Sequence, residues 1–193
     1  MLAMTKQRMS PIQLFLILLI VKTTSFASIP NQWTGKNLIT GDSWSTPSHF
    51  QDKKGHVIIF MSAKCPCSNS HAAELIKLAD LYKDFRFTAV HSNMDETYES
   101  AQDYFKKLGL KFDIVQDEKA EMADQLKAFK TPHVFVLSPN AEILYHGGIT
   151  NSSHAPSATQ HFLADALEDI HQNRPVKVSE GRTLGCVISR TKN

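Results

Sequence analysis

The chain has 193 residues, 42% of them hydrophobic and 21% charged, and a formal net charge of +2 at pH 7. This length is enough for one domain with a sizeable core, and three cysteines are too few for a disulfide-stapled scaffold. Three of the basic residues (Lys6, Arg8 and Lys22) lie near the N-terminus, so the rest of the chain is nearly neutral and no nucleic-acid partner is expected.

Residues 1–27 have the pattern of an export signal. Two basic residues precede an apolar run from Ile12 to Val21, and Ser25-Phe26-Ala27 is a small-x-small cleavage site. The apolar run is about half as long as the ~20 residues that a membrane-spanning helix needs. We therefore expect cleavage after Ala27, a periplasmic location and no stable membrane span; a retained N-terminal anchor is the alternative.

Residues 28–50 are polar and rich in turn residues, which predicts an extended N-terminal segment with one short strand. Trp33 and Trp44 within it are interpreted as hydrophobic anchors rather than binding platforms. The folded domain is expected over residues 51–173, and residues 174–193 are expected to form a C-terminal tail that contains a cysteine.

The start of the expected domain combines a buried strand with two cysteines. Val57 to Met61 is a short, unbroken apolar run, which is typical of a strand buried on both faces. Apolar residues then recur at helical spacing from Ala72 onward. Cys65 and Cys67 therefore lie where the strand turns into a helix, and Pro66 suits the first turn of that helix because its missing N–H would have no intrahelical partner.

This position favours a reactive thiol. Free N–H groups and the positive end of the helix dipole stabilise a thiolate, and the thiolate is the nucleophilic form of cysteine. Lys64 adds a positive charge next to the pair, and polar neighbours such as Ser68 predict an exposed turn. The competing interpretation, a buried and inert cysteine, is the less favoured one.

Downstream of this turn, strands and helices alternate. The pattern predicts strands at 85–91 and 112–115, helices at 95–108 and 117–129, a hairpin of strands at 134–137 and 142–146, and a last helix at 157–172. Such an order predicts an α/β fold with a mixed central sheet flanked by helices. The cysteine turn then lies at the carboxyl end of a central strand, which is the usual place for a site in such sheets.

The sequence resembles the thioredoxin fold and, more narrowly, the exported bacterial redoxins of the AhpC/TSA-like type. The resemblance rests on the segment Lys64-Cys65-Pro66-Cys67-Ser68, on Thr131-Pro132-His133, and on the hairpin that follows. It implies a cis Thr131–Pro132 bond facing the active cysteine. It also implies that backbone at Thr131, Pro132 and His133 binds a substrate chain beside the thiol.

Two departures from the family pattern bear on activity. Thioredoxin-like enzymes use Cys-x-x-Cys, whose second sulfur resolves the mixed disulfide, but here that position holds Ser68 and the second cysteine is Cys67. A peroxiredoxin needs the frame Pro-x-x-x-Thr/Ser-x-x-Cys. Ser62 fits this frame, whereas Ile58 stands in place of the proline, so peroxidase activity is not expected.

The tail offers another resolving cysteine. Cys186 lies in a Gly-Cys-x-Ile segment that also resembles the tails of some exported redoxins. We expect the tail to fold back so that Cys186 pairs with Cys65 or Cys67. Such a bridge closes a loop of about 120 residues and would stabilise the fold by on the order of 5 kcal/mol in the chain-entropy model. A free thiol on a mobile tail is the alternative, and a Cys65–Cys67 bridge is disfavoured by disulfide geometry.

The function predicted from these patterns is that of a periplasmic thiol–disulfide oxidoreductase with no cofactor. Its partners would be protein thiols or disulfides and a redox partner protein. One alternative is a copper(I) metallochaperone, because a Cys-x-Cys pair near His71 and His133 suits a soft metal. A second is a non-catalytic binding module that kept the fold but lost the usual cysteine pair.

Overall fold

The computed structural model describes residues 33–46 and 52–191. The predicted export signal lies outside these residues. Within them, no helix is both long and apolar enough to cross a membrane.

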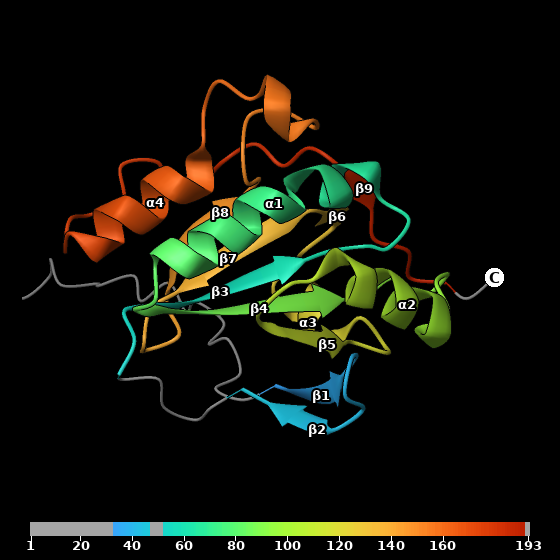
Figure 1. Cartoon of the computed structure of the whole chain (residues 1–193). Coiled ribbons are helices and arrows are strands. Elements are labelled where there is room, and N and C mark those ends of the chain that lie inside the picture. Colours follow the sequence, from blue (N-terminus) through green and yellow to red (C-terminus); the bar gives the residue numbers. More distant parts are fainter. Residues whose placement is uncertain (1–32, 47–51, 192–193) are drawn as a thin grey trace, which may run out of the picture.

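A seven-stranded mixed sheet, in the order β2-β1-β5-β4-β3-β7-β8, forms the centre of the structure (Figure 1). Its strands are β1 (Thr34–Asn37), β2 (Ser43–Ser45), β3 (Gly55–Phe60), β4 (Phe85–His91), β5 (Asp113–Gln116), β7 (His133–Leu137) and β8 (Ile143–Gly147). The strands β3, β4 and β5 are parallel, whereas β7 and β1 run antiparallel to their neighbours β3 and β5. This arrangement confirms the predicted α/β fold with a mixed central sheet.

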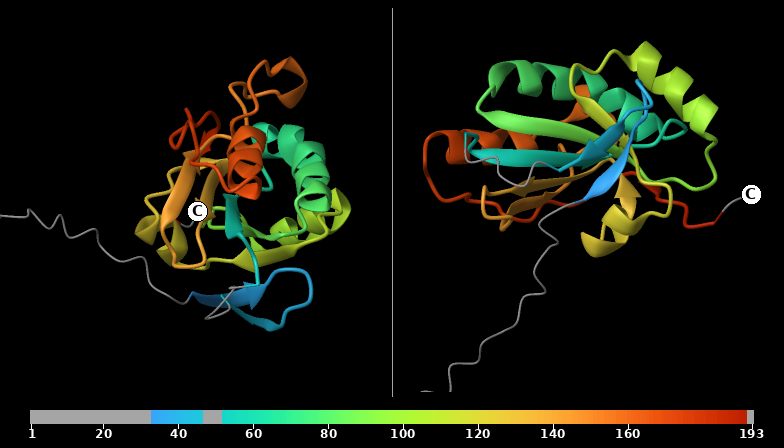
Figure 2. Two further views of the ribbon diagram at one scale, coloured as in Figure 1. Left: turned by 90° about the vertical axis from the view of Figure 1, so that its left-hand side faces the viewer. Right: turned by 90° about the horizontal axis from the view of Figure 1, so that it is seen from below.

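Four α-helices and one 3₁₀ helix flank the sheet. They are α1 (Pro66–Leu81), α2 (Tyr98–Leu108), α3 (Glu121–Gln125), η1 (Ala155–Ser157) and α4 (Phe162–His171). Each apolar face of the sheet has its own core, as expected where both faces are covered. Helices α1, α2 and α4 lie on one face of the sheet and α3 lies on the other (Figure 2). Side chains of α1, α2 and α4 belong to the core of the first face, and those of α3, together with both tryptophans, belong to the core of the second face.

Three local expectations from sequence are corrected by the structure. The N-terminal segment contains the two strands β1 and β2 rather than one. The helix expected at 117–129 is reduced to α3, because Asp117 accepts hydrogen bonds from the backbone of Met122 and Ala123 and delays the first turn. The last helix begins at Phe162 rather than near Ser157, since Pro156 supports only a short 3₁₀ turn that ends at an extended Ala158.

Other local expectations are confirmed. Trp33 and Trp44 are buried in the second core, as hydrophobic anchors should be. The helix expected at 95–108 is present as α2 and ends at Gly109 as expected, in the left-handed conformation that a residue without Cβ adopts most easily, but it begins at Tyr98 rather than at Asp95 because the Thr97 side chain caps its start.

The C-terminal tail returns to the sheet end that carries the cysteine turn. Its strand β9 (Cys186–Val187) pairs antiparallel with β6 (Lys130–Thr131), the two residues before Pro132. Ile188 is buried in the second core, next to this pairing. The tail therefore docks onto the domain through β9 and the buried Ile188, while many residues of 174–191 remain exposed.

Candidate active site

Cys65 is the N-cap residue of α1 and follows β3 by a short turn, as the sequence predicted. Pro66 occupies the first turn of the helix. The turn is tied back to the helix because the backbone N–H of Ser62 donates to Ser68 Oγ over 3.3 Å. One expectation was wrong: Cys65 is only 2% exposed, while Cys67 is half-buried. Other segments of the chain cover the Cys65 sulfur.

The segment that covers Cys65 is the one that precedes Pro132. The Thr131–Pro132 bond is cis, as the resemblance implied. In its thiol form, Cys65 donates to the carbonyl oxygen of Thr131 over 2.9 Å. Thr131 itself lies opposite Cys186 in the β6–β9 register. The cis-proline segment thus joins the helix N-terminus to the tail.

Three thiols meet at this point. The Sγ atoms of Cys65, Cys67 and Cys186 all lie within 4.8 Å of one another, and each cysteine is unpaired. Cys186 is far from Cys65 and Cys67 in the sequence, so it is the folding of the chain that brings the three sulfurs together. The expected return of the tail to the cysteine turn is present in the structure.

The three thiols differ in acidity. Burial by itself raises the pKa of Cys65, but hydrogen bonds with Cys186, with the Thr131 side chain and with the backbone of Ser68 outweigh it and lower that pKa to about 7. Desolvation, followed by the hydrogen bond to Cys65, raises the pKa of Cys186 to about 12. Desolvation and the charge of Cys65 also raise the pKa of Cys67. Near neutral pH, Cys65 is therefore the cysteine that ionises most readily, and the other two remain thiols.

The tail is held tightly over the site by backbone and side-chain contacts. The Ile188 N–H donates to the carbonyl of Phe129 over 3.0 Å, and the Met94 N–H donates to the carbonyl of Ser189 over 3.1 Å. Arg190 binds the Asp124 carboxylate and the carbonyl of Ala128. Each of these contacts positions Cys186 opposite Thr131.

The other residues predicted from sequence to support the site lie around it with different roles. The Lys64 Nζ donates to the carbonyl of Asp95 over 2.9 Å, so its hydrogen bond is made to the neighbouring loop. Ser68 is fully buried and binds the turn. His133 is buried and packs against Phe129 and Phe135.

A buried carboxylate beneath the turn was missed in the sequence. Glu96 accepts hydrogen bonds from the Ser62 hydroxyl and from the backbone N–H of Ala63, and it pairs with His91 over 3.1 Å. Burial alone raises the pKa of Glu96, but the hydrogen bonds from His91 and Ser62 reverse this and hold it below its usual range. The available signal was the placement of both residues after one strand, since His91 ends β4 and Glu96 lies in the loop that follows it.

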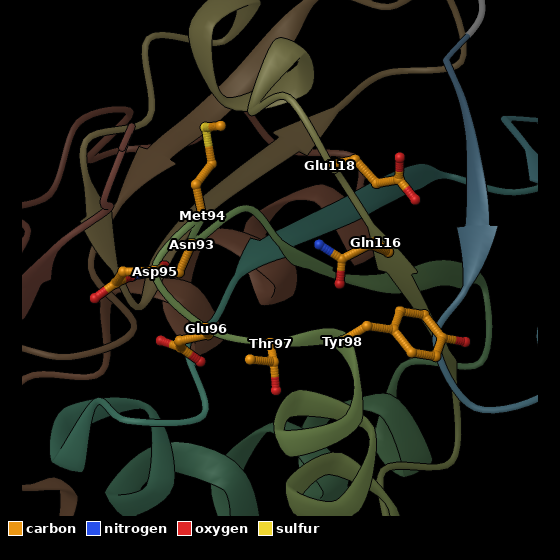
Figure 3. A pocket seen from close by; sticks show the side chains of 8 residues that line it. All are labelled: Asn93, Met94, Asp95, Glu96, Thr97, Tyr98, Gln116 and Glu118. Carbon is orange, nitrogen blue, oxygen red and sulfur yellow. The ribbon is translucent and has the colours of Figure 1, made fainter. Parts of the chain in front are cut away.

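Glu96 also lines a hollow near the site. A cavity of about 450 Å³ lies between the β4–α2 loop and the end of β5 (Figure 3). Its lining is mostly polar or acidic: Asn93, Met94, Asp95, Glu96, Thr97, Tyr98, Gln116 and Glu118. The cavity adjoins the cysteine turn through Glu96 and Asp95, which bind Ala63 and Lys64.

The arrangement of these elements defines the class of protein. A mixed sheet, a cysteine at the N-terminus of the helix after its central strand, and a cis-proline segment facing that cysteine together make a thioredoxin-like fold. A family model described as "AhpC/TSA family" matches residues 31–146, and the chain belongs to this family. No curated protein sequence matches the chain.

Solved structures agree with the fold. The chain is 25% identical to an uncharacterized conserved protein from Geobacillus kaustophilus, with a TM-score of 0.71, covering 84% of this chain and 89% of that one. It is 21% identical to a hypothetical protein from Sinorhizobium meliloti 1021, with a TM-score of 0.74 and coverage of 83% and 91%. A thiol-disulfide oxidoreductase from Bacteroides fragilis is 25% identical, with a TM-score of 0.53 and coverage of 62% and 88%.

Proposed function

We propose that the protein is a thiol–disulfide oxidoreductase that acts on protein thiols or disulfides through Cys65. The observation that carries this proposal is the meeting of three thiols within 4.8 Å at a helix N-terminus beside cis Pro132. Family membership and the similarity to a thiol-disulfide oxidoreductase support it. The export pattern of residues 1–27 supports a periplasmic location, where disulfides persist.

The reaction proceeds through a mixed disulfide. The Cys65 thiolate attacks one sulfur of a client disulfide, and the other client sulfur leaves as a thiolate that takes up a proton. A second thiol of the cluster then loses its proton and attacks the Cys65 sulfur, which releases the first client sulfur. The client is reduced by two electrons and the protein now holds an internal disulfide. A redox partner protein returns the two electrons, and the reverse sequence oxidises a dithiol client.

Cys186 is the favoured resolving residue. Cys186 lies directly opposite Thr131 in the pairing of β6 with β9, and the Thr131 carbonyl accepts the hydrogen bond of Cys65. The strand pairing therefore holds the Cys186 sulfur close to the Cys65 sulfur. Cys67 is separated from Cys65 by Pro66 alone, and a Cys-x-Cys bridge fits the preferred disulfide torsion poorly. Peroxidase chemistry is not supported, since the buried Ile58 stands where the peroxidatic frame requires proline.

The client would bind where the tail now lies. The backbone of Thr131, Pro132 and His133 is the expected pairing edge for a substrate chain, and β9 already pairs with Lys130 and Thr131. A client strand and the tail therefore compete for one edge. Release of β9 exposes both the edge and Cys65, and its return brings Cys186 back to resolve the mixed disulfide.

A disulfide map combined with turnover tests the proposal. The protein, without its export signal, is oxidised with glutathione disulfide, alkylated and mapped by peptide mass, and insulin reduction is assayed with dithiothreitol as electron source. We expect a reducible Cys65–Cys186 link in the wild type, loss of turnover in Cys65→Ser, and accumulated mixed disulfide in Cys186→Ser. Turnover that survives Cys65→Ser would contradict the attacking role of Cys65, whereas a wild type whose three thiols resist oxidation and that shows no turnover would favour the non-catalytic binding module.

A further inference from the structure

The sulfur cluster has the dimensions of a metal site. A metal held by three thiolates at about 2.3 Å keeps the sulfurs about 4 Å apart. The Sγ atoms of Cys65, Cys67 and Cys186 lie within 4.8 Å of one another, so small side-chain shifts bring all three onto one ion. Across residues 33–46 and 52–191, this is the one group of cysteine, histidine or acidic side chains close enough to hold a metal ion.

We propose that the reduced protein binds one copper(I) ion through the three thiolates of Cys65, Cys67 and Cys186. Soft thiolate ligands select soft cations, and Cu(I) accepts three sulfurs, whereas Zn(II) in structural sites requires a fourth ligand. No fourth ligand of these types joins the cluster in the part of the chain that the structure describes. The site is therefore a three-sulfur site for a monovalent soft ion.

Neither histidine considered from the sequence belongs to this ligand set. The ring nitrogens of His71 lie 2.8 Å from the carbonyl of Cys67 and 2.9 Å from Thr150 Oγ1, and the ring is buried. The His133 ring lies between aromatic rings, 4.5 Å from the centroid of Phe135. The copper site inferred from the structure thus differs from the cysteine–histidine site considered from the sequence.

The surroundings suit a negatively charged metal–thiolate centre. Cys65 caps the N-terminus of α1, where the helix dipole offsets negative charge on the sulfurs. The Thr131 hydroxyl is buried with no partner other than the Cys65 sulfur. Hydrogen-bond donors therefore face the sulfurs from the protein side.

Copper binding and disulfide exchange would exclude each other. A disulfide between any two of the cysteines removes two of the three ligands, so only the fully reduced protein binds Cu(I). A bound ion in turn occupies the Cys65 sulfur and blocks its attack on a client. The inference rests on the cluster geometry and not on the proposed exchange activity, because a protein without turnover would still carry the three thiols.

The test is a metal titration under anaerobic conditions. The reduced protein competes for Cu(I) with bicinchoninate, a coloured Cu(I) chelator, and the copper-loaded protein is examined by X-ray absorption. We expect one copper per chain with three sulfur neighbours. Substitutions of residues that merely support a metal ligand already cost about 10–100-fold in affinity. Each of Cys65→Ser, Cys67→Ser and Cys186→Ser should therefore weaken Cu(I) retention by roughly tenfold or more.

A matched control separates the ligand from the tail that carries it. Val187→Ser introduces the same residue type one position beyond Cys186, at an exposed side chain, and should bind Cu(I) as the wild type does. Unchanged affinity in Cys186→Ser would overturn the three-sulfur site, and so would a wild-type protein that yields all copper to the chelator or that prefers Zn(II). Insulin turnover measured on copper-free protein reports separately on the exchange activity.

Discussion

At the scale of single residues, Cys65 combines burial with an acidic thiol. Its pKa is lowered to about 7 because hydrogen bonds with Cys186, Thr131 and the backbone of Ser68 outweigh the opposing effect of burial. A thiol is ionised, and hence nucleophilic, above its pKa. In metal-free, reduced protein, the alkylation rate of Cys65 by iodoacetamide should therefore rise with pH and reach half its maximum near pH 7, as followed by peptide mass.

Removal of a hydrogen-bond donor should shift this profile upward. Cys186→Ala deletes one of the partners that lower the pKa of Cys65, so the midpoint of its alkylation should move to higher pH. Cys67 and Cys186 should react slowly at pH 7, since their own pKa values are raised. A Cys65 midpoint that is the same in the wild type and in Cys186→Ala would contradict the contact between the two sulfurs.

The Glu96 carboxylate binds the cysteine turn, and we expect it to make a measurable contribution to the free energy of unfolding. Glu96→Gln keeps the shape but replaces a charged acceptor of hydrogen bonds from Ser62, Ala63 and His91. Loss of buried, charged hydrogen bonds typically costs about 1–3 kcal/mol. Urea unfolding at pH 7 should show a loss in this range, whereas Glu99→Gln, on the exposed first turn of α2, should leave the free energy of unfolding nearly unchanged.

At the scale of elements, the short pairing of β6 with β9 determines whether the thiols meet. A Cβ on Gly185 would collide with the carbonyl oxygen of Thr131, so Gly185→Ala should displace β9. Because β9 is not part of the seven-stranded sheet, the domain should stay folded in this variant. Hydrogen exchange at Cys186 and Val187 should accelerate, and the Cys65–Cys186 link should form more slowly. As a control, Val187→Ala changes an exposed side chain and should alter neither the hydrogen exchange nor the rate at which the link forms. Slow exchange retained in Gly185→Ala would contradict the proposed role of the β6–β9 pairing.

The elements also show what local sequence patterns can predict. Periodicity, capping and turn residues act within a few positions, and they predict the strand–turn–helix around Cys65, the end of α2 at Gly109 and the hairpin of β7 and β8. The short α3 is also a local effect, but it depends on side-chain hydrogen bonds of Asp117 that periodicity does not show. The burial of His133 depends on contacts between distant segments. The docking of the tail was expected only by analogy, and its register opposite Thr131 required the structure.

The whole molecule contains two histidines that folding holds in the neutral form. Burial, with the charge of Arg86, lowers the pKa of His56 to about 3. Burial, with the charges of His146 and Lys130, lowers the pKa of His133 to about 4. Between these values and the ordinary pKa of about 6.5, the unfolded chain binds protons that the native protein does not. Stability is therefore greatest above pH 6.5 and falls as the pH decreases.

A decrease in pH should thus lower the free energy of unfolding before the carboxylates become protonated. Linkage gives a loss of about 2 kcal/mol per histidine between pH 7.5 and pH 5, or about 4 kcal/mol for both. Urea unfolding at the two pH values measures this difference. His56→Gln keeps a hydrogen-bonding group near Thr88, but the new side chain cannot bind a proton. The variant should therefore lose about half of the difference in stability between the two pH values, even if it is less stable than the wild type at both of them. His154→Gln, at an exposed position, should leave the pH dependence unchanged. Equal stability of the wild type at pH 7.5 and pH 5 would contradict the burial of neutral imidazoles in this core.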